Sequence, residues 1–403
     1  ALHPLGLTPQ TPRCYAAFSA AAGTGAIGTH IIFTAFCPAR QKDSGPGGCR
    51  MLSIKRKTKT AYPHLLRHTF LQRLREEVFF TKKEWKRLLA AGVLMLFTCV
   101  VLLTAHANNR EFIRYAEFNV PYAALDRALA DDITCKGKVS WIDVLACLAA
   151  KYGGEWKRYK AADMDALHEQ LHSGETIESI TQGMQYFSYF RQVYGAVLGG
   201  FVGWHLQELK DDRWEIRYGL TAYSPLAEGY WYNDFDDFGA SRSYGFKRRH
   251  LGHDMMGSVG TPVIAVESGT VEALGWNQYG GWRIGIRSRD GKRYYYYAHL
   301  RKDHPFAEGL TVGQRVMAGD VIGYLGQTGY SHRENVNGIE TPHLHYGLEL
   351  VFDESQKESD NEIWVDLYAI TRLLERHRAT VHADGKEYVR EYEMLLFTPR
   401  RGT

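Results

Sequence analysis

The chain has 403 residues, which is enough for two or three domains with a sizeable buried core. Its 49 basic and 45 acidic residues nearly balance, so the net charge of +4 gives no indication of a nucleic-acid partner. An aromatic content of 13% excludes a disordered chain, and the negative mean hydropathy excludes a polytopic membrane protein. The six cysteines all lie at or before Cys147, which excludes a disulfide framework for the C-terminal half. Cys135 and Cys147 either pair or remain free thiols.

Residues 1–50 are rich in glycine, alanine, serine and proline, and Asp43 is their one acidic residue. They sustain neither a helical nor a strand period. Two explanations fit this composition: a start placed too far upstream, with Met51 as the true initiator, or a genuine disordered extension. We expect a non-native or disordered leader.

Residues 51–87 carry eleven lysines and arginines against three glutamates. The next eighteen residues, 88–105, contain no charge and reach the lower range for a membrane-spanning helix. The basic flank should stay in the cytoplasm, which places everything after about residue 107 outside. We therefore predict a single-pass anchor in the cell membrane with an extracytoplasmic C-terminal part. The alternatives are cleavage after the signal-like Ala105-His106-Ala107 and a buried core helix.

Residues 108–220 are predicted to form a helical domain. The expected helices are Phe112–Ala130, in which Pro121 marks a start or a break, Ile142–Tyr152, which ends at Gly153-Gly154, Asp163–Ser173 and Gln185–Phe201. No catalytic constellation occurs among them, and their tyrosine and phenylalanine stripe is more typical of a core than of a binding platform. The sequence identifies no protein partner for this domain.

Residues 221–352 change in character, because glycine, β-branched and aromatic residues increase and turn signals recur every eight to twelve residues. Tyr294–Tyr297 is a predicted strand. The pattern Gly260-x-x-Val263-x-Ala265 returns as Gly313-x-x-Val316-x-Ala318, which indicates two similar strand–turn–strand units. A mostly β domain follows from these features.

The last segment, residues 353–403, begins with a polar loop. A helix should follow, with Leu367, Ile370 and Leu374 on one face. The charged end of the chain is predicted to be peripheral.

Three histidine-containing fragments stand out: His250–Asp254, Tyr297–Leu300 and Pro342–Tyr346. Residues i and i+2 of a strand point to one face, so His343 and His345 should project together. Two imidazoles on one face either share one metal ion or divide the work, one binding the metal and the other acting on the substrate.

The first fragment needs a bend to bind a metal ion. On a fully extended strand at ~3.3 Å per residue, the Cα atoms of His250 and Asp254 would be about 13 Å apart. That separation is too large for two zinc bonds of about 2.0–2.2 Å, but Gly252 between them permits a bend. His253 falls on the opposite face and is not counted as a ligand. Two histidines and one aspartate leave the fourth position of a catalytic zinc site to water, whose pKa the metal lowers toward about 7.

Each fragment alone is a weak signal, but their order is specific. His-x-Gly-x-Asp, Gly-Thr-Pro-Val, Tyr-x-His-Leu, Gly-Asp-Val-Ile-Gly and Pro-His-Leu-His occur in succession. On these motifs the stretch Tyr244–Leu350, about a quarter of the chain, resembles the LytM/lysostaphin metallopeptidase family. The resemblance implies a small antiparallel β domain with a zinc site in an open groove, and cleavage of peptide bonds in the stems or cross-bridges of peptidoglycan.

By the same resemblance, the zinc ligands are His250, Asp254 and His345, and the catalytic residues are His299 and His343. All five are present, so nothing indicates a degenerate member. We therefore predict a membrane-anchored cell-wall endopeptidase of a bacterium. The alternatives are a non-enzymatic module that binds peptidoglycan or activates another hydrolase, and a structural component of a wall-spanning complex.

One departure from the family is visible between Gly329 and Pro342, where the loop is longer than the usual short one. This loop should border the groove, so the sequence does not specify which peptide bond is cut. His332, within the loop, either contacts the substrate or is an ordinary solvated histidine.

Overall fold

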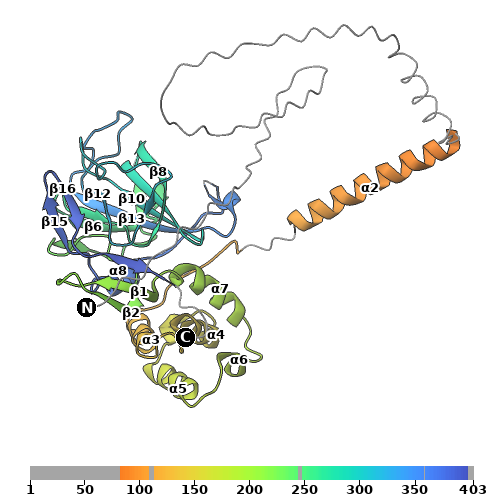
Figure 1. Cartoon of the computed structure of the whole chain (residues 1–403), viewed down its shortest axis with the longest axis horizontal. Coiled ribbons are helices and arrows are strands. Elements are labelled where there is room, and N and C mark those ends of the chain that lie inside the picture. Colours follow the sequence, from red (N-terminus) through yellow and green to blue (C-terminus); the bar gives the residue numbers. More distant parts are fainter. Residues whose placement is uncertain (1–81, 109–112, 244–246, 358, 398–403) are drawn as a thin grey trace, which may run out of the picture. The chain divides into compact units, whose positions relative to one another are not determined.

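The computed structural model describes residues 82–108, 113–243, 247–357 and 359–397 (Figure 1). The predictions for the leader 1–50 and for residues 51–81 lie outside these residues. The first described element is helix α2 (Lys82–Asn108), which continues from the basic segment through the predicted apolar span. No helix of the described residues is long and apolar enough to cross a membrane, so the predicted span at 88–105 is not supported.

The next part of the chain is helical, as predicted. Its helices are α3 (Tyr122–Thr134), α4 (Trp141–Tyr152), η1 (Trp156–Arg158), α5 (Ala161–His172), α6 (Ile177–Ile180) and α7 (Phe187–Leu198). Pro121 directly precedes α3, so it marks a helix start rather than a break, and residues 113–120 are not helical. Ser140 caps α4 by accepting a hydrogen bond from the Asp143 amide, and Gly153 ends it in the left-handed conformation.

The helical part ends before residue 220, so the predicted boundary at residue 220 was wrong. After α7 the chain forms an antiparallel hairpin of β1 (Val202–Glu208) and β2 (Trp214–Leu220). Both segments contain aromatic and β-branched residues on either side of a short polar turn, which is a hairpin pattern. The prediction that the charged end of the chain is peripheral was also wrong in part. Strand β17 (Met394–Leu396) pairs with β1, and its Met394 is completely buried.

A large sheet with the strand order β11-β8-β9-β10-β13-β6-β3 forms the centre of the β domain, and β14 pairs with β13. Its strands are β3 (Tyr232–Asp234), β6 (His253–Gly257), β8 (Gly269–Asn277), β9 (Gly281–Ser288), β10 (Arg293–Ala298), β11 (Arg315–Val316), β13 (His343–Leu350) and β14 (Ile363–Trp364). Smaller pairs are β4 (Ser241–Ser243) with β5 (Lys247–Arg249), β7 (Pro262–Ile264) with β12 (Val321–Tyr324), and β15 (Val381–Asp384) with β16 (Glu387–Arg390). Neighbouring strands run antiparallel, which confirms the predicted antiparallel β domain. The two segments that share the Gly-x-x-Val-x-Ala pattern begin alike: in each, a glycine in the left-handed conformation, Gly260 or Gly313, precedes a short strand.

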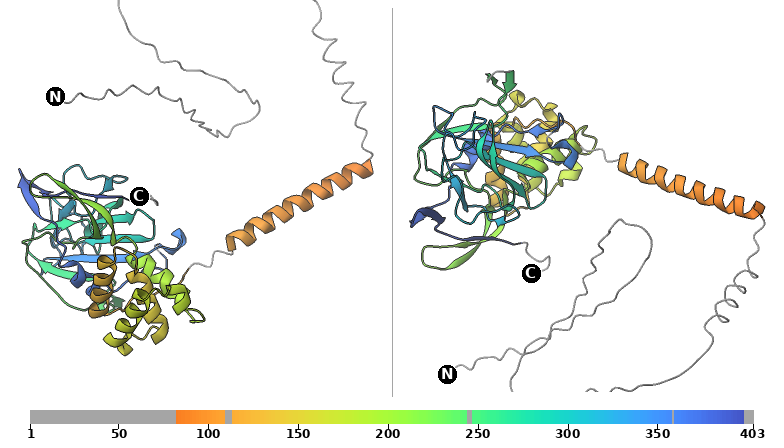
Figure 2. Two further views of the ribbon diagram at one scale, coloured as in Figure 1. Left: turned by 60° about the horizontal axis from the view of Figure 1, so that its bottom comes forward. Right: turned by 90° about the horizontal axis from the view of Figure 1, so that it is seen from above.

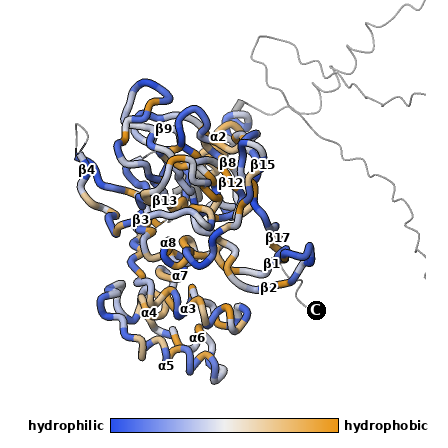
Figure 3. The backbone as a smooth tube through the Cα atoms, turned by 90° about the vertical axis from the view of Figure 1, so that its left-hand side faces the viewer, coloured by the Kyte–Doolittle hydropathy of each residue, from blue (hydrophilic) through white to orange (hydrophobic). Residues whose placement is uncertain are grey.

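Helices α3 to α7 lie beside the β domain and share one hydrophobic core with it (Figure 2). A hydrogen bond joins the two parts: the buried Arg293 guanidinium, which is paired with Glu267 at 2.7 and 3.0 Å, donates to the Ala196 carbonyl of α7 at 2.6 Å. Helix α8 (Tyr368–Leu374) contributes to the same core, as its apolar spacing predicts. Hydrophobic stretches run through α4, α7 and α8, whereas the outer loops are hydrophilic (Figure 3). This packing fixes the large sheet, whose other face carries the candidate site.

Candidate metal centre and groove

Two neighbouring strands position the predicted metal ligands. β13 and β6 pair so that His345 lies directly opposite Asp254. Opposed residues share a face, as do residues two apart along a strand, so His343 is on that face as well. His250 lies before β6, and the chain bends at Gly252 between them, as expected. The structure thus brings the three predicted ligands together.

The three ligand atoms form a nearly equilateral triangle. His250 Nε2 lies 3.0 Å from Asp254 Oδ1 and 3.1 Å from His345 Nδ1, and the last two atoms are 2.8 Å apart. Two imidazole nitrogens and a carboxylate oxygen can each offer a lone pair, so their convergence provides three ligands for a cation. Zinc bonds of about 2.0–2.2 Å place tetrahedral ligand atoms roughly 3.4 Å apart, which is close to the observed separations. The residues present therefore fit a zinc ion with three protein ligands.

Gly252 makes this arrangement possible in a way that the sequence did not indicate. A Cβ atom at this position would lie 2.5 Å from Cε1 and Nε2 of His345. The ring of His345 thus fills the space that the glycine leaves.

Asp237, which the sequence did not indicate, orients one of the ligands. Nδ1 of His250 lies 3.1 Å from the Asp237 carboxylate and 3.3 Å from its backbone carbonyl. A metal-binding histidine typically donates its other nitrogen to such a group, which fixes the ring. Arg242 forms an ion pair with Asp237 in turn. His253, expected on the opposite face, turns away from the centre and interacts with Asp234 at 2.9 Å.

The electrostatics of the centre keep Asp254 ionised. Burial alone would raise the pKa of Asp254, but hydrogen bonds from His250 and His345 hold it far below its ordinary value. Burial lowers the pKa of His345. Burial also acts to lower the pKa of His250, but the hydrogen bond to Asp254 and the charges of Asp254 and Asp237 raise it. The aspartate is therefore ionised at neutral pH, as a metal ligand must be.

Two further predicted residues, His343 and His299, flank the centre. Nδ1 of His343 donates to the Thr341 carbonyl at 2.8 Å, and Nδ1 of His299 donates to the Thr328 carbonyl at 2.9 Å. A carbonyl only accepts, so in each neutral ring the proton is on Nδ1 and Nε2 carries the lone pair. Nε2 of His343 lies 3.7 Å from Asp254 Oδ1. The ring centroids of His343 and His299 are 4.7 Å apart. Both rings thus present a proton acceptor close to the candidate metal position.

His299 is held in an unusual backbone conformation. Its φ of 61° lies in the left-handed region that residues with a side chain rarely adopt, and such strain is concentrated at functional sites. Burial lowers the pKa of His299 well below its ordinary value, and the neighbouring His343 and His345 add to this. The ring is therefore neutral and able to accept a proton.

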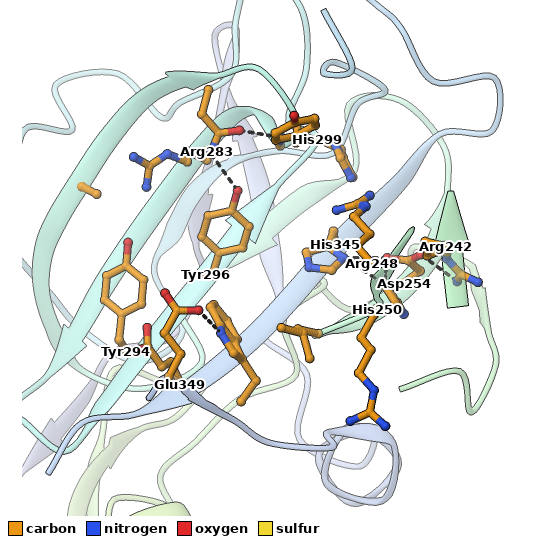
Figure 4. Close-up of a pocket in the computed structure, with 18 of the residues that line it drawn as sticks. Arg242, Arg248, His250, Asp254, Arg283, Tyr294, Tyr296, His299, His345 and Glu349 are labelled. Carbon is orange, nitrogen blue, oxygen red and sulfur yellow. Dashed lines mark hydrogen bonds and ion pairs between the residues drawn. The ribbon is translucent and has the colours of Figure 1, made fainter. Parts of the chain in front are cut away.

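A groove of about 840 Å³ extends from this centre over the same face of the sheet (Figure 4). Its floor continues along β10 and β13 past Tyr296 and Tyr294 to Glu349. The basic residues that line it are Arg242, Arg248, Arg249, Arg283 and Lys357. The sequence did not indicate these lining residues, because a single arginine or tyrosine within a strand forms no motif.

Glu349 shares the face of β13 that carries the two histidines, and the period-two alternation from His343 could have identified it. It is 3% exposed, and among the described residues its Oε1 has no hydrogen-bond partner. Burial and the nearby Glu362 raise its pKa to about 7. The groove therefore holds a carboxyl group that titrates near neutral pH.

The long loop before β13 borders the groove, as predicted. Tyr330 lines the groove and stacks on the ring of His299 at a centroid distance of 5.9 Å. His332 is exposed and interacts with Gln278 at 3.1 Å. It does not line the groove, which favours the solvated-histidine interpretation.

A second cluster of residues of the kinds that bind metal ions lies in the helical part. Asp131, Cys135 and His172 bring one ligand atom each within 4.8 Å of one another. The Cys135 sulfur lies 3.9 and 4.0 Å from the other two atoms, and the His172 side chain is 47% exposed. This group is looser and more exposed than the centre on the sheet. Cys135 and Cys147 are free thiols.

Comparisons with known proteins agree with the motifs. Residues 248–359 match the model of Peptidase family M23. An L-Ala–D-Glu endopeptidase of Bacillus subtilis (strain 168) is 38% identical over 154 residues, which cover 38% of this chain and 43% of that protein. The glycyl-glycine endopeptidase ALE-1 of Staphylococcus capitis is 41% identical over 98 residues, 24% of either chain. The solved catalytic domain of lysostaphin from Staphylococcus simulans is 31% identical, with a TM-score of 0.27 over 35% of this chain and 92% of that one. The chain spans less than half the length of the curated relatives it matches.

Proposed function

We propose that the chain, whose residues 248–359 form a peptidase family M23 domain, is a zinc-dependent endopeptidase that hydrolyses peptide bonds of bacterial peptidoglycan. The observation that carries the proposal is the triangle of His250, Asp254 and His345 at the floor of a large groove, with two further histidines beside it. A module that only binds peptidoglycan would have no need for all five residues. The complete set therefore favours an enzyme over that alternative.

His250, Asp254 and His345 would hold the zinc ion. When bound, zinc supplies a Lewis acid that polarises the peptide carbonyl and lowers the pKa of water toward about 7. Asp237 keeps His250 oriented through its Nδ1.

The two flanking histidines perform the proton transfers. Nε2 of each ring is the nitrogen left to accept a proton, because Nδ1 of each donates to a carbonyl. One accepts the proton of the attacking water, and the protonated ring then donates to the leaving amine or stabilises the developing oxyanion. We assign the transfer of the water proton to His343, and His299 would stabilise the developing oxyanion in its protonated form, with a proton on both ring nitrogens.

The peptide bond is inferred from the relatives. The relative that cleaves L-Ala–D-Glu matches 154 residues, whereas the glycyl-glycine endopeptidase matches 98. The longer match favours a stem peptide over a glycine cross-bridge. We infer that the chain cleaves the L-Ala–D-Glu bond.

An extracytoplasmic location follows from the proposed substrate, since peptidoglycan lies outside the membrane. In intact cells without a wall, added protease should degrade the β domain. Protection of the β domain in such cells would contradict this location.

The function is tested by digesting purified peptidoglycan with the full-length protein and identifying the products by mass spectrometry. The proposal predicts new amino termini at glutamate, and their loss in the Asp254→Ala variant. An intact polymer after incubation with zinc-loaded wild-type protein would contradict the proposed function. Cleavage at a different bond would contradict only the assigned bond.

A further inference from the structure

The C-terminal ends of helices α3 and α5, which neighbour each other in Figure 1, bring residues of metal-binding types together. Asp131 and Cys135 lie one turn apart at the end of α3. His172 is the last residue of α5, and His168 lies one turn before it. Residues four apart on a helix share a face, so each helix end presents a pair of these side chains on one side. The groove, in contrast, is lined by residues between Arg242 and Trp364, so this cluster is separate from it.

Three ligand atoms converge where the two helices meet. Nε2 of His172 lies 3.0 Å from Oδ1 of Asp131. The sulfur of Cys135 lies 3.9 Å from the same oxygen and 4.0 Å from Nδ1 of His172. Zinc bonds of about 2.3 Å to sulfur and about 2.0–2.1 Å to nitrogen place these tetrahedral ligand atoms roughly 3.6 Å apart. The sulfur therefore needs to move by only about 0.4 Å to share an ion with the histidine.

The carboxylate of Asp131 lacks a full set of partners. Among the described residues, its Oδ2 atom is buried without a hydrogen-bond partner, and so is Nε2 of His168, which lies 3.6 Å away. In the same part of the chain, Asp131 forms ion pairs with His168 and His172 but with no lysine or arginine. Histidine is mostly neutral at neutral pH, so these contacts leave the negative charge of the carboxylate largely unbalanced. Native proteins leave few buried polar atoms unpaired, and a bound cation would balance this charge.

The electrostatics of the helix ends also favour a cation here. The last carbonyl groups of a helix give its C-terminal end a partial negative charge. Helix α3 ends at Thr134 after 13 residues, and α5 ends at His172 after 12 residues. The cluster is therefore located at two negative helix ends, both of which stabilise a positive ion between them.

We propose that Asp131, Cys135 and His172 form a second zinc site, which links the end of α3 to the end of α5. A thiolate, an imidazole and a carboxylate together suit zinc, whereas Ca²⁺ and Mg²⁺ prefer oxygen ligands alone. His172 is half-exposed, so water takes the fourth coordination position. Cys135 binds as a thiolate, and its proton passes to the solvent when the ion binds.

The link would stabilise a helix that has a small hydrophobic contact of its own. Within the described helix α5, the buried residues are Met164 and Leu167. Segments with few buried apolar contacts open locally at low cost in free energy. An ion that binds the closed form and not the open form lowers the population of the open form. Zinc should therefore slow the local opening of α5.

The test loads the full-length protein with cobalt(II), which replaces zinc in tetrahedral sites and absorbs in the near ultraviolet when a thiolate binds it. The ligands of the centre on the sheet are two histidines and an aspartate, so this absorption reports the second site alone. The wild type should show the band, and Cys135→Ser should lose it. Cys99→Ser removes an exposed thiol of α2 and is the matched control, which should keep the band.

Two further measurements use the same variants. Cys135→Ser should hold one equivalent of zinc fewer than the wild type while it cleaves peptidoglycan at the wild-type rate. His172→Gln changes a half-exposed side chain without disturbing the core, and it should weaken cobalt binding at least tenfold. In hydrogen exchange, zinc at 100 times its dissociation constant should slow the α5 amides of the wild type by up to about 100-fold. The same zinc concentration should leave the α5 amides of His172→Gln unchanged.

The outcomes are decided independently of the peptidase activity. Absence of the thiolate band in the wild type, or its persistence in Cys135→Ser, overturns the inference. Equal cobalt affinities of His172→Gln and the wild type also overturn it, because the histidine would then not be a ligand. If zinc does not slow exchange in α5 of the wild type, the proposed link between the helices is wrong. Intact peptidoglycan after incubation with the wild type would contradict the proposed function and leave this site unaffected.

Discussion

Replacing Gly252 by alanine should displace a zinc ligand without straining the backbone. Gly252 does not adopt a positive φ, so alanine is compatible with its backbone conformation. The added Cβ, however, would lie 2.5 Å from Cε1 and Nε2 of His345, whereas ordinary contacts are 3.4–4 Å. The ring must therefore move by about 1 Å, several times the roughly 0.2 Å that zinc–ligand distances tolerate. Loss of a group that merely orients a ligand costs ten- to a hundredfold in metal affinity or activity, so we expect at least that loss here.

The assay is zinc affinity by competition with a chromophoric chelator, measured beside the initial rate of peptidoglycan cleavage. Gly203→Ala is the matched control, because Gly203 is also a strand glycine and a Cβ there would meet no atom within 4 Å. The control should keep the wild-type affinity and rate. Wild-type zinc affinity and rate in Gly252→Ala would refute the steric reasoning and the position of His345 in the centre.

Three further changes test other parts of the site. His343→Ala and His299→Ala should retain zinc yet cleave about 10²- to 10⁴-fold more slowly, because they remove proton transfer or charge stabilisation. Loss of zinc from the His343→Ala variant would instead make His343 a zinc ligand. Asp237→Ala should lower zinc affinity by only about tenfold, since the Asp237 carbonyl still accepts from His250; an unchanged affinity would remove the aspartate from the centre. Glu349 has a folded-state pKa of about 7 against an ordinary value of 4.5, so the free energy of unfolding should fall as pH rises from about 4.5 to 7 and stay low above it. Glu349→Gln should remove this fall and be about 3 kcal/mol more stable than the wild type at pH 8 in denaturant titrations. Parallel pH dependences of the two proteins would contradict this.

Local spacing made part of the site predictable from the sequence. His343 and His345 share a face because a strand has a period of two, and this holds whatever the strand pairs with. The bend at Gly252 was also local, because an extended chain would have kept His250 and Asp254 too far apart. The C-terminal end of α4 followed in the same way from Gly153.

Contacts between distant segments were not predictable. Asp237 meets His250 only because the chain before β4 folds back over the centre, and nothing in its acidic surroundings distinguishes it from its neighbours. Arg283 reaches the groove through the register of β9 against β10 and β13, and a single sequence does not specify that register. The pairing of β17 with β1 was not predictable because the two strands lie almost two hundred residues apart, whereas the hairpin of β1 and β2 had a local pattern that was overlooked.

The central claim is that His250, Asp254 and His345 hold a catalytic zinc ion. The most direct test measures zinc per chain by inductively coupled plasma mass spectrometry beside peptidoglycan cleavage, for the wild type and Asp254→Ala. Asp211→Ala, on the exposed turn between β1 and β2, is the control. The account predicts that Asp254→Ala loses one equivalent of zinc and all measurable cleavage, while the control keeps both. Full zinc content in Asp254→Ala, or undiminished cleavage by protein stripped of metal, would contradict it.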